Sequence, residues 1–461
     1  MPGLLPQPFR QFILLGLMTF ALPGCAIFPF FSAPPDFIGV RGTQLTEGNS
    51  PYYFAGINYW YGPYIGSPGR TGHRARLLRE LDTLAANGLT NLRILGGSEG
   101  SPIPWALQPS LQPQPGVIDD SLLEGLDFLL AEMGKRRMRA VIFLTNYWEW
   151  SGGMSSYNLW ADSTSFADPR TQGWDAYMDS CGSFFARSEA QTMFRDYIRR
   201  IVTRTNSVTG KRYRDDPTVM AWQLANEPRS GTDSPTSEAQ FEAFVSWVDA
   251  TAKYIKLLDP HHLVSTGSEG VWGSLNREEN FLRLHATPSV DYLTFHCWPG
   301  IWRWFDMRRP EETWQVAESL AVDYVRTHIK LARQLQKPLV LEEFGLVRDS
   351  GETRPGSPVF YRERLLSQVF AEILDSAAAG APIAGSNVWA WGGEASGLPP
   401  HLRWKPGYPL LGDPPHEPQG MHAIFNADSS TRRILADHSR RMRELSAQPL
   451  RAREVLVSGA P

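Results

Sequence analysis

The sequence predicts an α/β protein, a (β/α)8 TIM barrel with long loops at the C-terminal face of its strands. Eight apolar runs with strand character alternate with helical segments along the chain, a pattern typical of parallel β/α units. The length of 461 residues suits one such barrel with insertions. No glycine-rich phosphate loop follows the first strand, which disfavours an open nucleotide-binding sheet.

The predicted elements follow one another in a regular order. The strands cover residues 52–60, 90–95, 139–146, 218–226, 262–268, 291–298, 337–345 and 383–391. Helical spacing of apolar residues predicts helices over 74–88, 119–136, 188–206, 238–259, 311–336, 361–380 and 427–446. The first helix ends in Asn87-Gly88, a favourable C-terminal cap. The stretch 147–186 is predicted to be a long irregular loop.

The N-terminal residues 1–25 are predicted to be a lipoprotein signal peptide. A short charged lead precedes an apolar stretch that is too short for a permanent membrane span. The sequence Leu22-Pro23-Gly24-Cys25 then resembles a bacterial lipobox, in which the cysteine is acylated. We therefore expect an anchor on Cys25 in a bacterial cell envelope, at the outer membrane or cell surface, with secretion as the alternative. The Pro-rich residues 26–45 are expected to be a tether or clasp, and residues 46–450 the barrel domain.

Composition restricts the class of partner. The net charge is −3 and the chain carries no basic run, which argues against nucleic acid. Aromatic residues reach 12%, including 16 Trp, and the flat apolar face of an indole suits a sugar ring. Cys181 and Cys297 either pair in an oxidising compartment or remain two unrelated buried thiols. We expect a monomer.

Polar and aromatic residues gather at the predicted strand ends, which share one face in a barrel. They are Asn58, Trp60, Arg93, Asn146, Trp148, Asn226, Glu227, Glu269, His296, Trp298, Glu343, Trp389 and Trp391. Two carboxylates in a Trp-lined groove indicate glycoside hydrolysis, and a retaining mechanism needs them roughly 5–5.5 Å apart. Glu227 is the predicted acid/base and Glu343 the predicted nucleophile. Arg93 would keep the nucleophile ionised, and Asn226 would hold the 2-hydroxyl of the sugar.

Two motifs resemble the catalytic strands of glycoside hydrolase family 5, in clan A. LANEPR (224–229) is similar to the acid/base strand of that family, and PLVLEEFGL (338–346) to its nucleophile strand. Arg93, His296 and Trp389 stand where the family has its second-strand arginine, sixth-strand histidine and eighth-strand tryptophan. Further stretches resemble the endo-β-1,4-mannanase branch, so that the resemblance runs from about residue 50 to 446. They are 56–62, 146–154, 296–306 and 412–420.

The resemblance implies a retaining endo-acting hydrolase of β-1,4-mannosidic bonds in mannan, glucomannan or galactomannan, without cofactor or metal. Glu227 and Glu343 would be catalytic. The implied substrate-binding residues are Arg93, Asn226, His296, Trp298, Trp389, Trp391, Asn146, Trp148 and Trp60. Trp298 departs from the pattern, because many relatives carry there a tyrosine whose hydroxyl bonds the nucleophile. An indole N–H can donate but cannot accept.

Other interpretations remain open. An exo-β-mannosidase or transglycosylase of the same fold would have one end of its groove blocked by the inserts 147–186 and 392–426. An endo-β-1,4-glucanase is a third possible enzyme activity. A catalytically inactive mannan-binding lipoprotein is disfavoured because both glutamates are present. His416 and Glu417 resemble a metal pair without a third ligand. For them we expect a structural loop or a distal hydroxyl contact.

Overall fold

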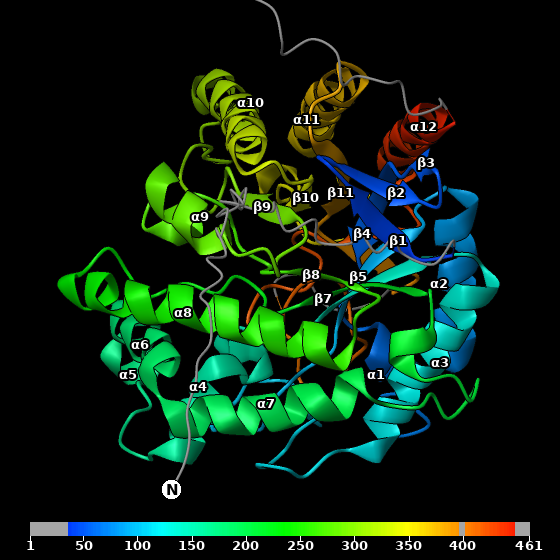
Figure 1. Ribbon diagram of the computed structural model, residues 1–461. Coiled ribbons are helices and arrows are strands. Elements are labelled where there is room, and N and C mark those ends of the chain that lie inside the picture. Colours follow the sequence, from blue (N-terminus) through cyan, green and yellow to red (C-terminus); the bar gives the residue numbers. More distant parts are fainter. Residues whose placement is uncertain (1–35, 396–401, 448–461) are drawn as a thin grey trace, which may run out of the picture. The chain divides into compact units, whose positions relative to one another are not determined.

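The computed structural model describes residues 36–395 and 402–447. Its centre is a sheet of eight parallel strands in the order β8-β7-β6-β5-β4-β11-β10-β9, surrounded by helices (Figure 1). This arrangement confirms the predicted (β/α)8 barrel. The predicted signal peptide and the lipid anchor on Cys25 lie outside the described residues.

The barrel strands follow the predicted runs closely. They are β4 (Phe54–Asn58), β5 (Asn91–Leu95), β6 (Arg139–Phe143), β7 (Val219–Gln223), β8 (Leu263–Ser265), β9 (Leu293–Cys297), β10 (Leu339–Phe344) and β11 (Ile383–Val388). Nearly all of their residues are buried, as expected for parallel strands covered on both faces. Between β8 and β9, the N–H of Asp291 donates to Val264 O at 2.8 Å and the N–H of His296 to Glu269 O at 3.2 Å. These bonds join the two ends of the sheet.

The larger helices lie where apolar periodicity places them. They are α2 (Arg74–Ala86), α3 (Asp120–Lys135), α7 (Ser188–Val202), α8 (Pro235–Leu258), α10 (Pro310–Leu335), α11 (Phe360–Ala378) and α12 (Ser429–Ser446). Asn87 is the C-cap of α2, and Gly88 follows with φ +74°. Glycine adopts this left-handed conformation without the steric strain that a side chain would cause. The expected cap is therefore confirmed.

Several shorter helices are additions to the prediction. They are α1 (Gly62–Gly66), α4 (Gly153–Ala161), α5 (Pro169–Gln172), α6 (Trp174–Gly182) and α9 (Glu278–His285). The prediction of an irregular loop over 147–186 is therefore wrong in part, since three helices lie inside it. Each of the three has at most nine residues, too few turns for a clear apolar period, and tertiary packing supplies most of the stability of such short helices.

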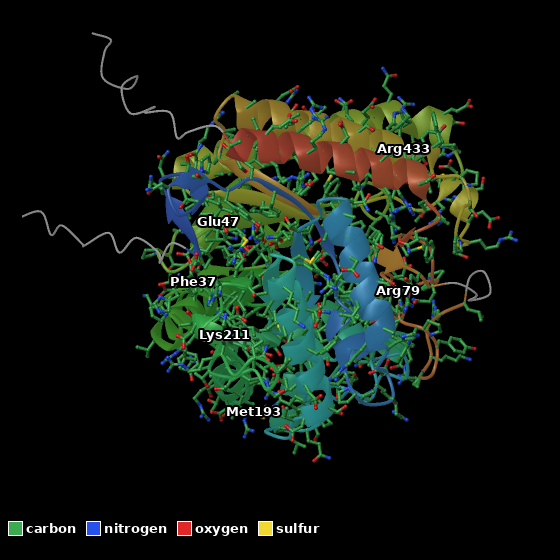
Figure 2. All side chains as sticks on the ribbon, turned by 90° about the vertical axis from the view of Figure 1, so that its right-hand side faces the viewer. Phe37, Glu47, Arg79, Met193, Lys211 and Arg433 are labelled. Atoms are coloured by element: carbon green, nitrogen blue, oxygen red, sulfur yellow. The ribbon has the colours of Figure 1, made fainter. Side chains whose placement is uncertain are left out.

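A small antiparallel sheet precedes the barrel and covers the N-terminal ends of its strands. It consists of β1 (Ile38–Arg41), β2 (Gln44–Glu47) and β3 (Ser50–Pro51). Ile38 and Leu45 pack in one buried cluster with barrel residues that include Val141 and Val340. Figure 2 labels Glu47, the last residue of β2, and Phe37, which directly precedes β1. The described part of the expected tether thus belongs to the folded domain, and residue 46 lies inside β2.

The last barrel strand leads into a loop that carries further elements. β12 (Trp391–Gly393) pairs with β13 (Ile424–Phe425), and α12 follows. Among residues 36–395 and 402–447, no helix is long and apolar enough to cross a membrane. Cys181 and Cys297 are buried free thiols, so they do not form the disulfide that the sequence left open.

Candidate active site

Both predicted catalytic carboxylates lie at C-terminal ends of barrel strands. Glu227 follows β7, and Glu343 belongs to β10; both are buried. The backbone of Glu227 has φ +49°, in the left-handed region that residues with a side chain rarely adopt. Its N–H donates to Gly267 O at 2.9 Å, which holds this turn in place. Such strained positions gather at functional sites.

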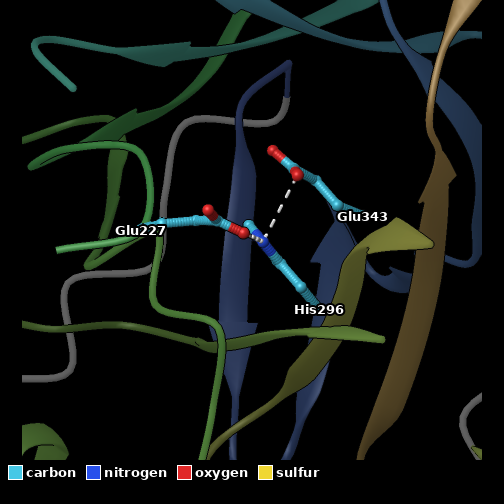
Figure 3. A group of neighbouring side chains, drawn as sticks. All are labelled: Glu227, His296 and Glu343. Carbon is cyan, nitrogen blue, oxygen red and sulfur yellow. Dashed lines mark hydrogen bonds and ion pairs between the residues drawn. The ribbon is translucent and has the colours of Figure 1, made fainter. Parts of the chain in front are cut away.

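The two carboxyl groups converge on His296, a residue of β9 (Figure 3). His296 Nδ1 lies 2.6 Å from Glu227 Oε1 and 3.4 Å from Glu343 Oε2. One oxygen of each glutamate and this nitrogen lie within 4.8 Å of one another. That proximity fits the carboxyl spacing of roughly 5–5.5 Å in retaining glycosidases better than the spacing of about 6.5–9.5 Å in inverting ones.

Arg93, a residue of β5, is the cation that contacts the predicted nucleophile. Its side chain is fully buried, and its Nη1 donates to Glu343 Oε1. Nη2 donates to Asn226 Oδ1 at 2.7 Å, and Nε donates to Gln223 Oε1 at 2.8 Å. Glu342 Oε2 lies 3.6 Å from the same Nε and accepts a hydrogen bond from Gln223 Nε2. The guanidinium therefore joins strands β5, β7 and β10 beneath the carboxyl pair.

Asn146 supports the site from behind. Its Oδ1 accepts hydrogen bonds from Asn226 Nδ2 and from the N–H of Trp148, both at 3.1 Å, and its Nδ2 donates to Ser151 Oγ at 3.0 Å. The amide of Asn146 is fully buried. The prediction that it binds substrate is thus not supported by its position, because its polar atoms are used to orient Asn226.

The electrostatic environment differs between the two glutamates. Burial has the strongest influence on both and raises the pKa of each; Arg93 opposes it at Glu343, and the hydrogen bond from His296 opposes it at Glu227. The net result is a pKa of Glu343 well above its usual value and a pKa of Glu227 below its usual value. Burial also lowers the pKa of His296 to about 4, so this imidazole is neutral at pH 7.

A cavity of about 390 Å³ opens above the carboxyl pair. Its lining residues are Trp148, Trp150, Trp174, Asn226, Glu227, Arg229, Glu269, Trp272, Trp298, Ile301, Trp302, Glu343, Trp389, Pro414, His416 and Glu417. The predicted residues Trp148, Asn226, Trp298 and Trp389 therefore face the space in which a substrate would lie. The Trp148 Nε1–H also donates to Glu227 Oε2, and the rings of Trp298 and Trp389 meet edge to face at 6.1 Å.

Two predicted tryptophans lie elsewhere. Trp60 is fully buried, donates from Nε1 to Gly412 O at 2.7 Å, and packs at 5.2 Å against Trp150, which does line the cavity. Trp391 is buried and belongs to β12, a separate strand that begins after β11 has ended at Val388. The prediction that either side chain binds substrate is not supported. Arg93 and His296 also lie behind the cavity wall, where they contact the two glutamates.

Several residues that line the cavity are not among those predicted from the sequence. Arg229 forms an ion pair with Glu269, and its guanidinium lies 5.1 Å from the ring centre of Trp148. Its place directly after the Asn-Glu-Pro motif was an available signal. Trp174 and Trp272 offered none, since each lies in an insert whose path depends on tertiary packing.

A parallel barrel that presents two adjacent carboxylates in a tryptophan-lined cavity defines a glycoside hydrolase of the (β/α)8 type. The family model for GH family 5 beta-mannosidase-like proteins matches residues 35–447. The chain therefore belongs to glycoside hydrolase family 5.

Three relatives illustrate the likeness. Mannan endo-1,4-beta-mannosidase 3 of Oryza sativa subsp. japonica is 31% identical over 368 residues, which are 76% of this chain and 72% of the rice protein. A mutant of the family 5 mannosidase of Rhizomucor miehei, in complex with mannosyl-fructose, matches with TM-score 0.81 and 32% identity, covering 89% of this chain and 98% of that one. The endo-1,4-beta-mannanase of the same organism shares the fold, with TM-score 0.65, 22% identity and coverage of 88% and 99%.

Proposed function

We propose that the protein hydrolyses internal β-1,4-mannosidic bonds of mannan, glucomannan or galactomannan with retention of configuration. The convergence of Glu227 and Glu343 within 4.8 Å carries this proposal. Membership of a mannosidase-like family and the names of the plant relatives support the choice of mannan over cellulose.

In the proposed mechanism, Glu343 attacks the anomeric carbon while Glu227 donates its proton to the leaving oxygen. The bond to the leaving sugar breaks and a covalent glycosyl-enzyme forms. Glu227, now a carboxylate, removes a proton from water, whose oxygen attacks the same carbon and releases Glu343. Asn226 lines the cavity beside both groups, and we assign it the sugar 2-hydroxyl.

The contacts of each glutamate support this assignment of roles. Two carboxyls this close share one proton at neutral pH. Arg93 remains charged and donates directly to Glu343, whereas the neutral His296 gives Glu227 only weak support for a charge. We therefore place the negative charge on Glu343 and the proton on Glu227, although burial raises the pKa of Glu343, and at Glu227 the contacts with His296 and its other neighbours together outweigh burial and lower the pKa.

The proposed activity is tested by incubating the purified protein with mannan and, in parallel, with cellulose. We expect new reducing ends from mannan at a rate well above that from cellulose. Release from cellulose without release from mannan would contradict the proposal and favour the endo-β-1,4-glucanase. A matched Glu343→Ala preparation controls for contaminating enzymes.

Exo action on short mannosides is the second candidate function. The Rhizomucor miehei relative, a mannosidase whose mutant binds mannosyl-fructose, favours it. In this chain, His416 Nδ1 lies 3.5 Å from Glu149 Oε1, so the two inserts that follow β6 and β11 meet beside the cavity. Mannose as the sole early product from mannohexaose would establish exo action, and a mixture of oligosaccharides would establish endo action.

We further propose that Cys25 carries a lipid that holds the enzyme in the cell envelope. The Leu-Pro-Gly-Cys sequence after an apolar stretch supports this proposal. We expect a Cys25→Ser variant to move from the membrane fraction to the soluble fraction of bacterial cells. An unchanged membrane fraction would contradict the lipid anchor.

A further inference from the structure

Four ionisable side chains line the cavity but have no part in the proposed mechanism: Arg229 and Glu269, which form an ion pair, and His416 and Glu417. His416 and Glu417 belong to the loop between β12 and β13, and both face the space above the catalytic carboxyls. His416 Nδ1 and Glu417 Oε2 are buried atoms without a hydrogen-bond partner. These two atoms lie against buried neighbours. The outer atoms, His416 Nε2 and Glu417 Oε1, lie 3.9 Å apart on side chains that are 28% and 17% exposed, so they are the atoms that can meet a ligand in the cavity.

Each of the two side chains is held by a more deeply buried group. His416 Nδ1 lies 3.5 Å from Oε1 of the fully buried Glu149, which accepts a hydrogen bond from Trp105 Nε1 at 2.8 Å. Glu417 Oε2 lies 3.4 Å from Nδ1 of His422, which is only 4% exposed. Both contacts are close without hydrogen-bond geometry, so the side chains are positioned and still unsatisfied.

The loop itself has a fixed conformation at this point. Asp413 is buried, and its carboxylate accepts hydrogen bonds from the N–H groups of Gly420, at 2.7 Å, and His422, at 2.5 Å. These bonds close the turn that carries His416 and Glu417. A preformed pair of acceptor and donor groups loses little entropy when a ligand binds.

The rest of the cavity indicates what this ligand is. A carboxylate accepts two hydroxyl hydrogen bonds and an imidazole both donates and accepts, while the tryptophans of the cavity offer apolar faces to sugar rings. We propose that His416 and Glu417 bind hydroxyl groups of one mannosyl unit of the substrate and so help to select the sugar. This inference rests on the proposed mannoside hydrolysis and holds for endo and exo cleavage alike.

Binding to an inactive protein tests the proposal without interference from turnover. We would measure the Kd of mannotriose by calorimetry in a Glu343→Gln background, with Glu417→Gln or His416→Ala added. Loss of a hydrogen bond to a charged group is expected to weaken binding about 10- to 100-fold for Glu417→Gln. Glu312→Gln, on the exposed first turn of α10, is the matched control and should leave the Kd unchanged.

Deoxygenated sugars separate a direct contact from a structural effect. If Glu417 binds a hydroxyl, the analogue that lacks this hydroxyl binds weakly to the Glu343→Gln protein. Adding Glu417→Gln should then weaken the binding of that analogue no further. Additive losses for every analogue would overturn the inference, as would an unchanged Kd for mannotriose.

A cation site is the alternative to a sugar contact, because Asp413, Glu417 and His422 also offer atoms within 4.8 Å of one another. Zn²⁺ that raises the melting temperature, with sugar affinity unchanged in both variants, would show a cation site instead.

Hydrolysis assays of the wild-type enzyme test the proposed function separately from the binding experiment. Hydrolysis of mannotriose or mannan by the wild type, with no effect of either substitution on binding, would refute the role of His416 and Glu417 and leave the proposed function intact. Absence of hydrolysis of any β-mannoside would refute the proposed function and, with it, the inference.

Discussion

Replacement of Glu343 by alanine is expected to lower kcat on mannan by a factor on the order of 10⁴ to 10⁶, the range seen when a nucleophile is removed. The variant loses the carboxylate that is placed to attack the anomeric carbon. Its fold should persist, since the site keeps Arg93 hydrogen-bonded to Asn226 and Gln223. Reducing-end assays on wild type and variant measure the ratio, and calorimetry should show that sugar binding is retained.

Small anions distinguish the nucleophile from the acid/base. In Glu343→Ala, azide can occupy the vacated volume and attack the anomeric carbon directly, which yields the α-mannosyl azide from an activated β-mannoside. Glu227→Ala is the matched variant: it still forms the glycosyl-enzyme with an activated substrate, so azide attacks from the opposite face and yields the β-mannosyl azide. The limb of the pH profile that reports the general acid should also disappear in Glu227→Ala.

The reverse pattern of azide products would exchange the two roles. It would mean that the proton of the pair resides on Glu343 in the enzyme that binds substrate, in line with the raised pKa of Glu343 and the lowered pKa of Glu227. Unimpaired turnover by Glu343→Ala would remove both assignments.

The barrel and its catalytic centre were accessible from sequence because they depend on local signals. Apolar runs fixed the strands, and a residue at the end of a parallel strand must lie on the same face as the others. Glu227, Glu343 and Arg93 therefore could be placed together without any knowledge of side-chain contacts. The same reasoning placed His296 beside them, although its contact with both carboxyls required the coordinates.

The walls of the cavity were less accessible because they depend on long inserts. The apolar pattern predicts that Trp391 ends the eighth strand, but β11 ends three residues earlier, at Val388. Trp174, His416 and Glu417 reach the cavity through loops whose course is set by contacts between segments far apart in the chain. Such contacts leave no periodic pattern in the sequence.

A buried ion pair holds the loop that carries His416 and Glu417. Of the substitutions proposed here, one that removes this pair is expected to lower the free energy of unfolding most. Arg348 is fully buried and its Nη1 donates to Asp428 Oδ1 at 2.9 Å. It also donates from Nη2 to Ala423 O at 3.0 Å and from Nε to Gly420 O at 3.2 Å. One guanidinium thus connects the end of the loop to the start of α12.

Asp428→Ala should lower the free energy of unfolding by about 3–5 kcal/mol, because it leaves the Arg348 charge buried without a counter-ion. Urea denaturation followed by tryptophan fluorescence measures the change. Asp437→Ala, which removes an exposed ion-pair partner of Arg440 on the same helix, is the control and should change stability by less than about 1 kcal/mol. Arg348→Met combined with Asp428→Leu should recover much of the loss, since an apolar pair needs no counter-ion. Equal midpoints for Asp428→Ala and Asp437→Ala would show that the loop is anchored by its backbone contacts alone.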